Sequence, residues 1–153
     1  MALSTKDIRN VAIAGHNGTG KTSLFEQFLY YSNVISRPET VESGKTTSDY
    51  TEEEVSRKIS IHAALANVSW QGKSLNFIDT PGTADFVGEV TCGFRTCESA
   101  LMVVDARDGA QIASTHGLSE IPVRNSGLIP KLSLNFSNVF SDSGTLPPMM
   151  FDR

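Results

Sequence analysis

Near its start the chain carries the octapeptide Gly15-His16-Asn17-Gly18-Thr19-Gly20-Lys21-Thr22, which fits the pattern G-x-x-x-x-G-K-[ST]. Glycines in such a loop permit left-handed backbone conformations and let main-chain N–H groups approach an anion closely. The lysine of the pattern reaches the terminal phosphates of a bound nucleotide, and the hydroxyl residue after it offers an oxygen to Mg²⁺. The octapeptide therefore predicts a site for a nucleoside triphosphate and its metal ion.

The segments on both sides of the octapeptide have the pattern that a phosphate loop requires. Before it, Val11-Ala12-Ile13-Ala14 is a continuous apolar run, which is typical of a buried parallel strand. After it, large apolar residues recur at helical spacing over residues 24–29, with Glu26 and Gln27 expected on the other side of the helix. Such a helix would direct its positive N-terminus at the bound phosphates.

Bulk composition limits the classes of function. The 153 residues suit one domain, and a net charge of −4 argues against direct sequence-specific nucleic-acid binding, since such proteins are basic. No run of about 18 apolar residues occurs, so no membrane contact and a cytoplasmic location are expected. Cys92 and Cys97 lack a metal-ligand spacing and are expected to be buried thiols inside a helix.

Residues 1–110 alternate between strand and helix patterns, which is typical of an α/β domain. Strands are predicted at 65–70 and 75–78, and the turn Gln71-Gly72-Lys73 between them indicates a hairpin. The spacing of apolar residues predicts a helix over 86–97, followed by a buried strand at 101–104.

Residues 32–60 form a polar stretch with few large apolar side chains. A stretch this long without strands is unusual in a compact domain and indicates either disorder or a mobile functional loop. Within it, Thr51-Glu52-Glu53-Glu54 fits a capping box, so a short helix is predicted at about 52–58.

The composition changes near residue 111. The segment 111–153 holds four of the six prolines, and its apolar residues lack helical periodicity. We expect a divergent or truncated tail of loop or disordered character there.

A second motif follows the predicted strand at 75–78. Asp79-Thr80-Pro81-Gly82 begins with an acidic residue at the carboxyl end of a strand beside the phosphate loop, where a carboxylate holds Mg²⁺ through water. Gly82 has no side chain, so its N–H is able to approach the terminal phosphate. Such a tetrapeptide also makes plain turns, but its place after a strand favours the functional interpretation.

Four segments of the chain carry a family resemblance: Ile8 to Thr22, Arg57-Lys58-Ile59-Ser60-Ile61, Phe77 to Val90, and Val103 to Gln111. They resemble the GTPase domain of elongation factor G. Within that family the chain resembles the divergent elongation factor G-like paralogues, whose phosphate loop also has Gly at the position of Gly18, where typical translation factors have Asp.

This resemblance implies a fold, ligands and a partner. The fold would be α/β, that of a P-loop NTPase of the GTPase type, with a mostly parallel central sheet that is truncated. Residues 1–110 would be the N-terminal part of a GTPase domain, GTP or GDP with Mg²⁺ the ligands, and the ribosome the partner. Residues 33–62 would be a loop that the γ-phosphate orders.

The resemblance also assigns roles residue by residue. Thr22 and Ser60 would bind Mg²⁺ directly and Asp79 through water, while Lys21 and Thr83 would be the catalytic residues. The nucleotide-binding residues would be Gly15, His16, Asn17, Gly18, Thr19, Gly20, Lys21, Thr22, Asp79, Thr80, Pro81 and Gly82.

Two departures from the family pattern qualify these expectations. The family places a histidine after D-T-P-G to position the attacking water, whereas this chain has Thr83, whose shorter hydroxyl predicts slow intrinsic hydrolysis. The guanine-reading element N-K-x-D has no match, although Asn135 and Asn138 mimic parts of it.

Several functions therefore stay open on the sequence alone. The first is a GTPase of the translation-factor type, and the second is a nucleotide-binding module that scarcely hydrolyses. A P-loop ATPase is the third, because the phosphate loop does not select the base. The fourth is an inactive fragment of a longer elongation factor G-like protein, which the change near residue 111 suggests.

Overall fold

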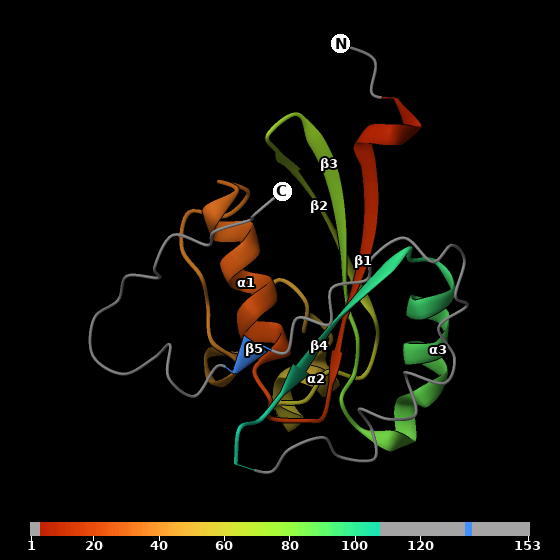
Figure 1. The fold of residues 1–153 in the computed structure, drawn as a ribbon. Coiled ribbons are helices and arrows are strands. Elements are labelled where there is room, and N and C mark those ends of the chain that lie inside the picture. Colours follow the sequence, from red (N-terminus) through yellow and green to blue (C-terminus); the bar gives the residue numbers. More distant parts are fainter. Residues whose placement is uncertain (1–3, 108–133, 136–153) are drawn as a thin grey trace.

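A five-stranded mixed sheet forms the centre of the molecule (Figure 1). The computed structural model describes residues 4–107 and 134–135. The strands are β1 (Ile8–Gly15), β2 (Ala64–Trp70), β3 (Lys73–Asp79), β4 (Ser99–Val104) and β5 (Leu134–Asn135), in the order β2-β3-β1-β4-β5. β1 pairs in parallel with β3 and β4, β5 is parallel to β4, and β2 is antiparallel to β3. The predicted α/β class with a mostly parallel sheet is confirmed.

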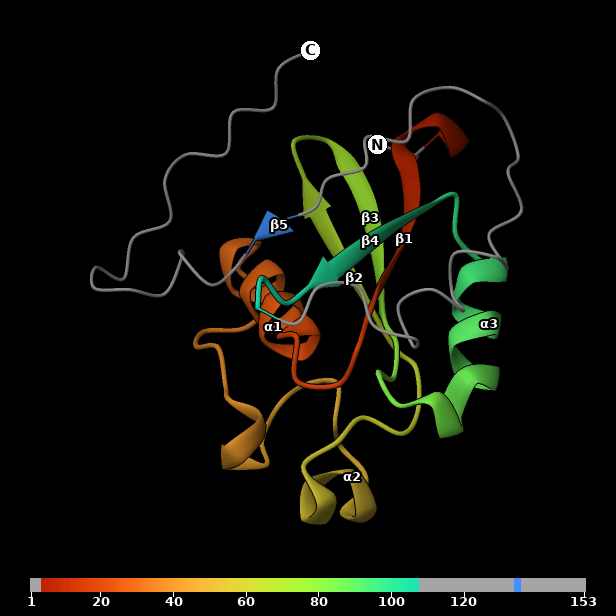
Figure 2. The same ribbon diagram turned by 60° about the horizontal axis from the view of Figure 1, so that its bottom comes forward.

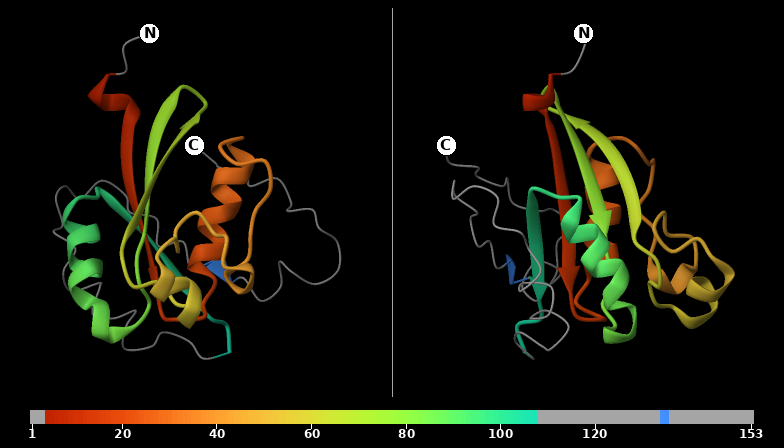
Figure 3. Two further views of the ribbon diagram at one scale, coloured as in Figure 1. Left: turned by 180° about the vertical axis from the view of Figure 1, so that it is seen from behind. Right: turned by 90° about the vertical axis from the view of Figure 1, so that its right-hand side faces the viewer.

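Helices cover both faces of this sheet. α1 (Lys21–Tyr31) packs on one face and α3 (Val87–Arg95) on the opposite face, as both views in Figure 3 show. α2 (Glu52–Arg57) lies at the end of the sheet where β1 finishes (Figure 1). Three short 3₁₀ turns complete the described helical structure: η1 (Thr5–Asp7), η2 (Val41–Ser43) and η3 (Ala84–Phe86).

The two faces of the sheet hold separate hydrophobic clusters. On the α1 face, Phe25 and Leu29 are fully buried, and Phe28 stacks on Phe77 of β3 with ring centroids 4.6 Å apart. On the α3 face, the small side chains of β1 let Val90 and Phe94 pack closely against the strand. Alternation of the strand side chains between two covered faces explains why β1 is apolar at consecutive positions.

The hairpin and the capping box form as predicted. Gln71 and Gly72 both have positive φ, 47° and 78°, which suits the tight turn between β2 and β3. The Thr51 hydroxyl accepts from the Glu54 N–H, and the Glu54 carboxylate accepts from the Thr51 N–H, so α2 begins as expected.

The prediction for the cysteines was wrong. α3 ends at Arg95, so Cys97 lies beyond the helix, where it is half-buried. Cys92 is exposed because α3 turns Val90, Gly93 and Phe94 toward the sheet and carries Cys92 on its outer surface.

Most of the tail predicted for 111–153 lies outside the described residues. Leu134–Asn135, expected in a loop, instead pair with Val103–Val104 as β5, which occupies the outer edge of β4. In the described part of the chain, no helix is long and apolar enough to cross a membrane.

Candidate functional site

Both predicted motifs lie at the carboxyl end of the central strands. The parallel register pairs Ile13 of β1 with Asp79 of β3, so the loops that leave these two strands emerge side by side. Figure 2 turns this end of the molecule forward, with the loop after β1 and the segment bearing α2 beside each other. The carboxyl edge of a parallel sheet is where ligands bind in α/β domains.

The loop Gly15 to Thr22 has the conformation that its glycines predict. Gly18 and Gly20 have φ of 79° and 89°, in the left-handed region, and Gly20 precedes α1 without any side-chain cap. The carbonyl of His16 accepts from the Thr19 hydroxyl at 2.8 Å and from Lys21 Nζ at 2.9 Å. Because no side chain caps α1 at Gly20, the first N–H groups of this helix are available to a bound anion.

The second motif is docked on this loop. The Asn17 N–H donates to the Gly82 carbonyl at 3.1 Å. A Cβ added to Gly82 would lie only 2.5 Å from the Asn17 nitrogen and would collide with Lys21 Nζ. Only glycine lets the backbone at position 82 pack this closely against Asn17 and the Lys21 ammonium group.

Lys21 is an unusually buried cation. It is 6% exposed, and this burial lowers the pKa of its ammonium group. The negative charges of Asp79 and Asp49 act in the opposite direction. A phosphate would supply the counter-charge that the site otherwise provides only through these two carboxylates.

The three residues expected at the metal converge. Thr22 Oγ1 donates to Asp79 Oδ2 at 2.9 Å and lies 3.3 Å from Ser60 Oγ. Burial raises the pKa of Asp79 to about 7, although the hydrogen bond from Thr22 and the positive charge of Lys21 both act to lower it. Its second oxygen, Oδ1, is buried without a hydrogen-bond partner among the described residues.

This donor set fits Mg²⁺. Hydroxyl and carboxylate oxygens are the ligands this ion prefers, and it retains waters and phosphate oxygens in its remaining positions. The described residues contain no group of three His, Cys, Asp or Glu side chains placed for a metal, and Thr22, Ser60 and Asp79 need none, because two of them are hydroxyls.

The remaining predicted residues surround this centre. Thr80 is buried, and both its N–H and its hydroxyl donate to the Ile13 carbonyl, at 3.1 and 2.8 Å, so its side chain braces β3 against β1. Pro81 is fully buried beside it. Thr83 follows Gly82, is half-buried, and precedes η3.

Asp49 is a residue that sequence reasoning missed. It is 4% exposed, neither carboxylate oxygen has a well-formed hydrogen bond within the described residues, and burial raises its pKa. The charge of Asp49 acts to raise the pKa of both Lys21 and Asp79, so this carboxylate influences the predicted metal site electrostatically. The only signal in the sequence was an acidic residue among the hydroxyl side chains of 46–48.

Glu26 lies where it was not expected. The helical pattern put it on the side of α1 away from the apolar residues, yet it is 1% exposed. Loop 33–62 covers it, and its carboxylate accepts the N–H groups of Glu39 at 3.1 Å and Thr47 at 2.5 Å. This polar segment is therefore folded, with η2 and α2 inside it.

Asn135 and Asn138, which mimic parts of the absent guanine-reading element, have different outcomes: Asn135 is in β5, and Asn138 lies outside the described residues. Of residues 127–138, only Leu134 and Asn135 lie in the described part of the chain, where they form β5.

A family model for the elongation factor Tu GTP binding domain matches residues 6–125. The chain belongs to this family. The elongation factor G-like protein of Mycobacterium tuberculosis is 42% identical to the chain over 102 residues, covering 67% of this chain and 14% of that protein. The mitochondrial ribosome-releasing factor 2 of Schizosaccharomyces pombe is 38% identical over 109 residues, covering 71% and 13%.

A solved structure has a similar fold. A crystal structure of a Thermus thermophilus protein matches with a TM-score of 0.73 and 35% identity, covering 74% of this chain and 17% of that one. The chain therefore spans 13 to 17% of the length of these relatives. The resemblance to elongation factor G is confirmed, and the domain belongs to the translational GTPase family.

Proposed function

We propose that this chain binds GTP and GDP with Mg²⁺ and hydrolyses GTP slowly, with loop 33–62 changing conformation between the two nucleotide states. The observation that carries the proposal is the convergence of Lys21, Thr22, Ser60 and Asp79 at a glycine loop that leads into the N-terminus of α1. Positive charge, hydroxyls and a carboxylate at one helix N-terminus suit a metal-bound triphosphate.

Each residue has a distinct task in this proposal. The loop N–H groups and Lys21 would hold the phosphates and stabilise the charge that develops during transfer. Thr22, Ser60 and Asp79 would hold Mg²⁺, which neutralises the phosphate oxygens when bound. The N–H of Gly82 would contact the terminal phosphate, so the motif would distinguish GTP from GDP.

Hydrolysis is expected to be slow because of Thr83. Its hydroxyl is shorter than an imidazole and cannot carry a positive charge, so it orients the attacking water less well. A second candidate is therefore a module that acts through its nucleotide-bound conformation and scarcely hydrolyses. Single-turnover kinetics separate the two: measurable phosphate release from bound GTP favours the GTPase, and intact GTP after hours favours the module.

The first test is Mg²⁺-dependent binding of a fluorescent GTP analogue to the 153-residue chain, with GTP, GDP and ATP as competitors. We expect displacement by GTP and GDP but not by ATP, and loss of binding in Lys21→Ala. Displacement by ATP alone would favour an ATPase. Absence of binding by a folded chain would contradict the proposal and favour an inactive fragment.

We also propose the ribosome as the partner. One relative is named a ribosome-releasing factor, and another an elongation factor G-like protein. If the chain acts as they are named, purified ribosomes should raise its rate of GTP hydrolysis or co-sediment with it in the GTP-bound state. Neither effect at micromolar ribosome concentration would contradict this partner for the chain by itself.

A further inference from the structure

Three buried or half-buried carboxylates hold the backbone of loop 33–62 and the residue after it. Glu26 of α1 accepts from Glu39 and Thr47, inside the first half of the loop. Glu54 of α2 accepts from Ile61 and His62 near the end of the loop. Glu89 comes from α3, outside the loop.

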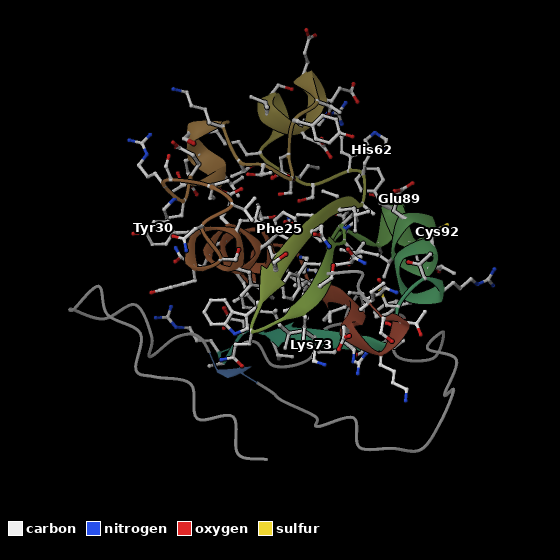
Figure 4. The ribbon with its side chains drawn as sticks, turned by 90° about the horizontal axis from the view of Figure 1, so that it is seen from above. Phe25, Tyr30, His62, Lys73, Glu89 and Cys92 are labelled. Carbon is white, nitrogen blue, oxygen red and sulfur yellow. The ribbon has the colours of Figure 1, made fainter. Side chains whose placement is uncertain are left out.

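Glu89 makes a specific contact with the end of this segment. Its Oε2 accepts the N–H of Ala63 at 2.9 Å. Figure 4 shows Glu89 on the side of α3 that faces the segment carrying His62, with Cys92 further along the helix. A hydrogen bond to a charged acceptor is roughly twice as strong as a neutral one, so this bond favours the docked arrangement of α3 and the segment.

The contact lies three residues from a predicted magnesium ligand. The three consecutive N–H groups after Ser60 all donate to carboxylates: Ile61 and His62 to Glu54 at 3.0 Å each, and Ala63 to Glu89. With these three groups held, little freedom remains for Ser60, whose hydroxyl lies 3.3 Å from that of Thr22.

The other end of α3 begins at the phosphate motif. Gly82, which contacts Asn17 and Lys21, is followed by Thr83, by η3 and then by α3. A displacement of Gly82 would move the helix that carries Glu89. The segment at Ser60 and the segment at Gly82 are therefore connected through η3 and α3.

We propose that Glu89 is a positioning residue that couples α3 to Ser60. The Ser60 hydroxyl is held at the metal position only while Glu89 of α3 accepts the Ala63 N–H. The proposed coupling rests on the proposed function, because it predicts that Glu89 changes the affinity for Mg²⁺. Glu89 itself would contact neither the metal ion nor the nucleotide. Coupling of this kind is reciprocal: loosening either segment loosens the other.

The test compares Glu89→Ala and Glu89→Gln with the wild-type chain, and Glu52→Ala serves as the matched control. Glu52 is an exposed glutamate at the start of α2. Two quantities are measured: the Mg²⁺ concentration that half-saturates binding of the fluorescent GTP analogue, and hydrogen exchange of residues 60–63 and of the first turn of α3. Circular dichroism establishes that each variant is folded.

We expect Glu89→Ala to raise the half-saturating Mg²⁺ concentration on the order of tenfold, as loss of other positioning partners does. Binding measured without Mg²⁺ should not change. Exchange should accelerate in both segments. Glu89→Gln keeps an acceptor oxygen and should restore most of both properties, and Glu52→Ala should match wild type.

Two results would overturn the coupling: an unchanged Mg²⁺ requirement in folded Glu89→Ala, or faster exchange at 60–63 with α3 unaffected. If the wild-type chain bound no nucleotide, the proposed function would fail. The exchange data would then decide the coupling separately, because faster exchange in both segments supports it and faster exchange in one or neither removes it.

Discussion

Thr22 and Asp79 are 57 residues apart in sequence, yet the Thr22 hydroxyl donates to the Asp79 carboxylate at 2.9 Å. This bond joins the first turn of α1 to the carboxyl end of β3. Both groups are buried, so the bond forms in a medium where an unpaired carboxylate oxygen is costly. A hydrated cation at this point would also satisfy Oδ1 of Asp79.

Asp79→Asn is therefore expected to weaken Mg²⁺ binding more than nucleotide binding. The amide keeps the shape and one acceptor but loses the charge that holds the metal-bound water, so the Mg²⁺ requirement for binding a GTP analogue should rise about 10- to 100-fold. Titration of Mg²⁺ at fixed nucleotide measures this. Asp85→Asn, at an exposed position before α3, is the control. Equal effects of the two variants would contradict the assignment.

Gly82→Ala tests the docking of the second motif. The new methyl would lie 2.5 Å from the Asn17 nitrogen, which no side-chain rotation relieves because that atom is backbone. We expect the preference for GTP over GDP to fall at least tenfold in competition binding.

Gly88→Ala provides the matched control for that substitution. A Cβ at Gly88 meets no atom within 4 Å, and the position lies in α3. Alanine there should leave nucleotide preference unchanged and raise the free energy of unfolding by up to ~1 kcal/mol. A similar loss of GTP preference in both glycine variants would show that the loss does not come from the close packing of Gly82 against Asn17 and Lys21.

Thr83→His tests the expected cause of slow hydrolysis. Imidazole reaches further than a hydroxyl and carries a positive charge, so it would position the attacking water better. General acid–base groups contribute on the order of 10²- to 10⁴-fold, and a gain of at least tenfold in the single-turnover rate is expected with GTP affinity unchanged. Thr83→Ala, which removes the hydroxyl without adding a ring, should not accelerate hydrolysis. An equal rate in all three proteins would exclude position 83 as the determinant.

Glu54 predicts a pH dependence of stability. Burial raises its pKa, but the N–H groups of His62, Ile61 and Thr51 together with the Thr51 hydroxyl outweigh burial and leave the pKa below its ordinary value of 4.5. The unfolded chain consequently binds more protons near that pH than the folded chain. The contribution of the ionised Glu54 carboxylate to the free energy of unfolding is therefore present above pH 4.5 and is lost as the pH falls through the folded-state pKa.

The variant Glu54→Gln isolates this contribution. Urea unfolding at several pH values should show the largest difference from wild type at neutral pH, and a shrinking difference below pH 4.5. Glu52→Gln, at an exposed position in the same helix, should show no such trend. A difference between wild type and Glu54→Gln that stays constant from pH 7 to pH 3 would contradict the role of the charge.

Much of the fold and the core of the candidate site could be predicted because the relevant signals are local. A glycine loop, a capping box and a two-residue hairpin turn each depend on neighbouring residues, so their spacing is sufficient. The helix at 86–97 was less well predicted: its periodicity identified Val90 and Phe94, but the chain leaves the helix after Arg95, and Cys92 is on its outer surface.

Residue spacing, taken alone, accounts for the phosphate loop, for the acidic motif after β3 and for their meeting at one edge of a parallel sheet, since carboxyl ends of parallel strands align. It could not predict how loop 33–62 is held. Glu26, Asp49 and Glu89 acquire their environments from segments 13 to 26 residues away or from charges brought together by packing. Their burial and partners follow from the packing of loop 33–62, which contains α2, against α1 and α3, and no pattern of neighbouring residues encodes that geometry.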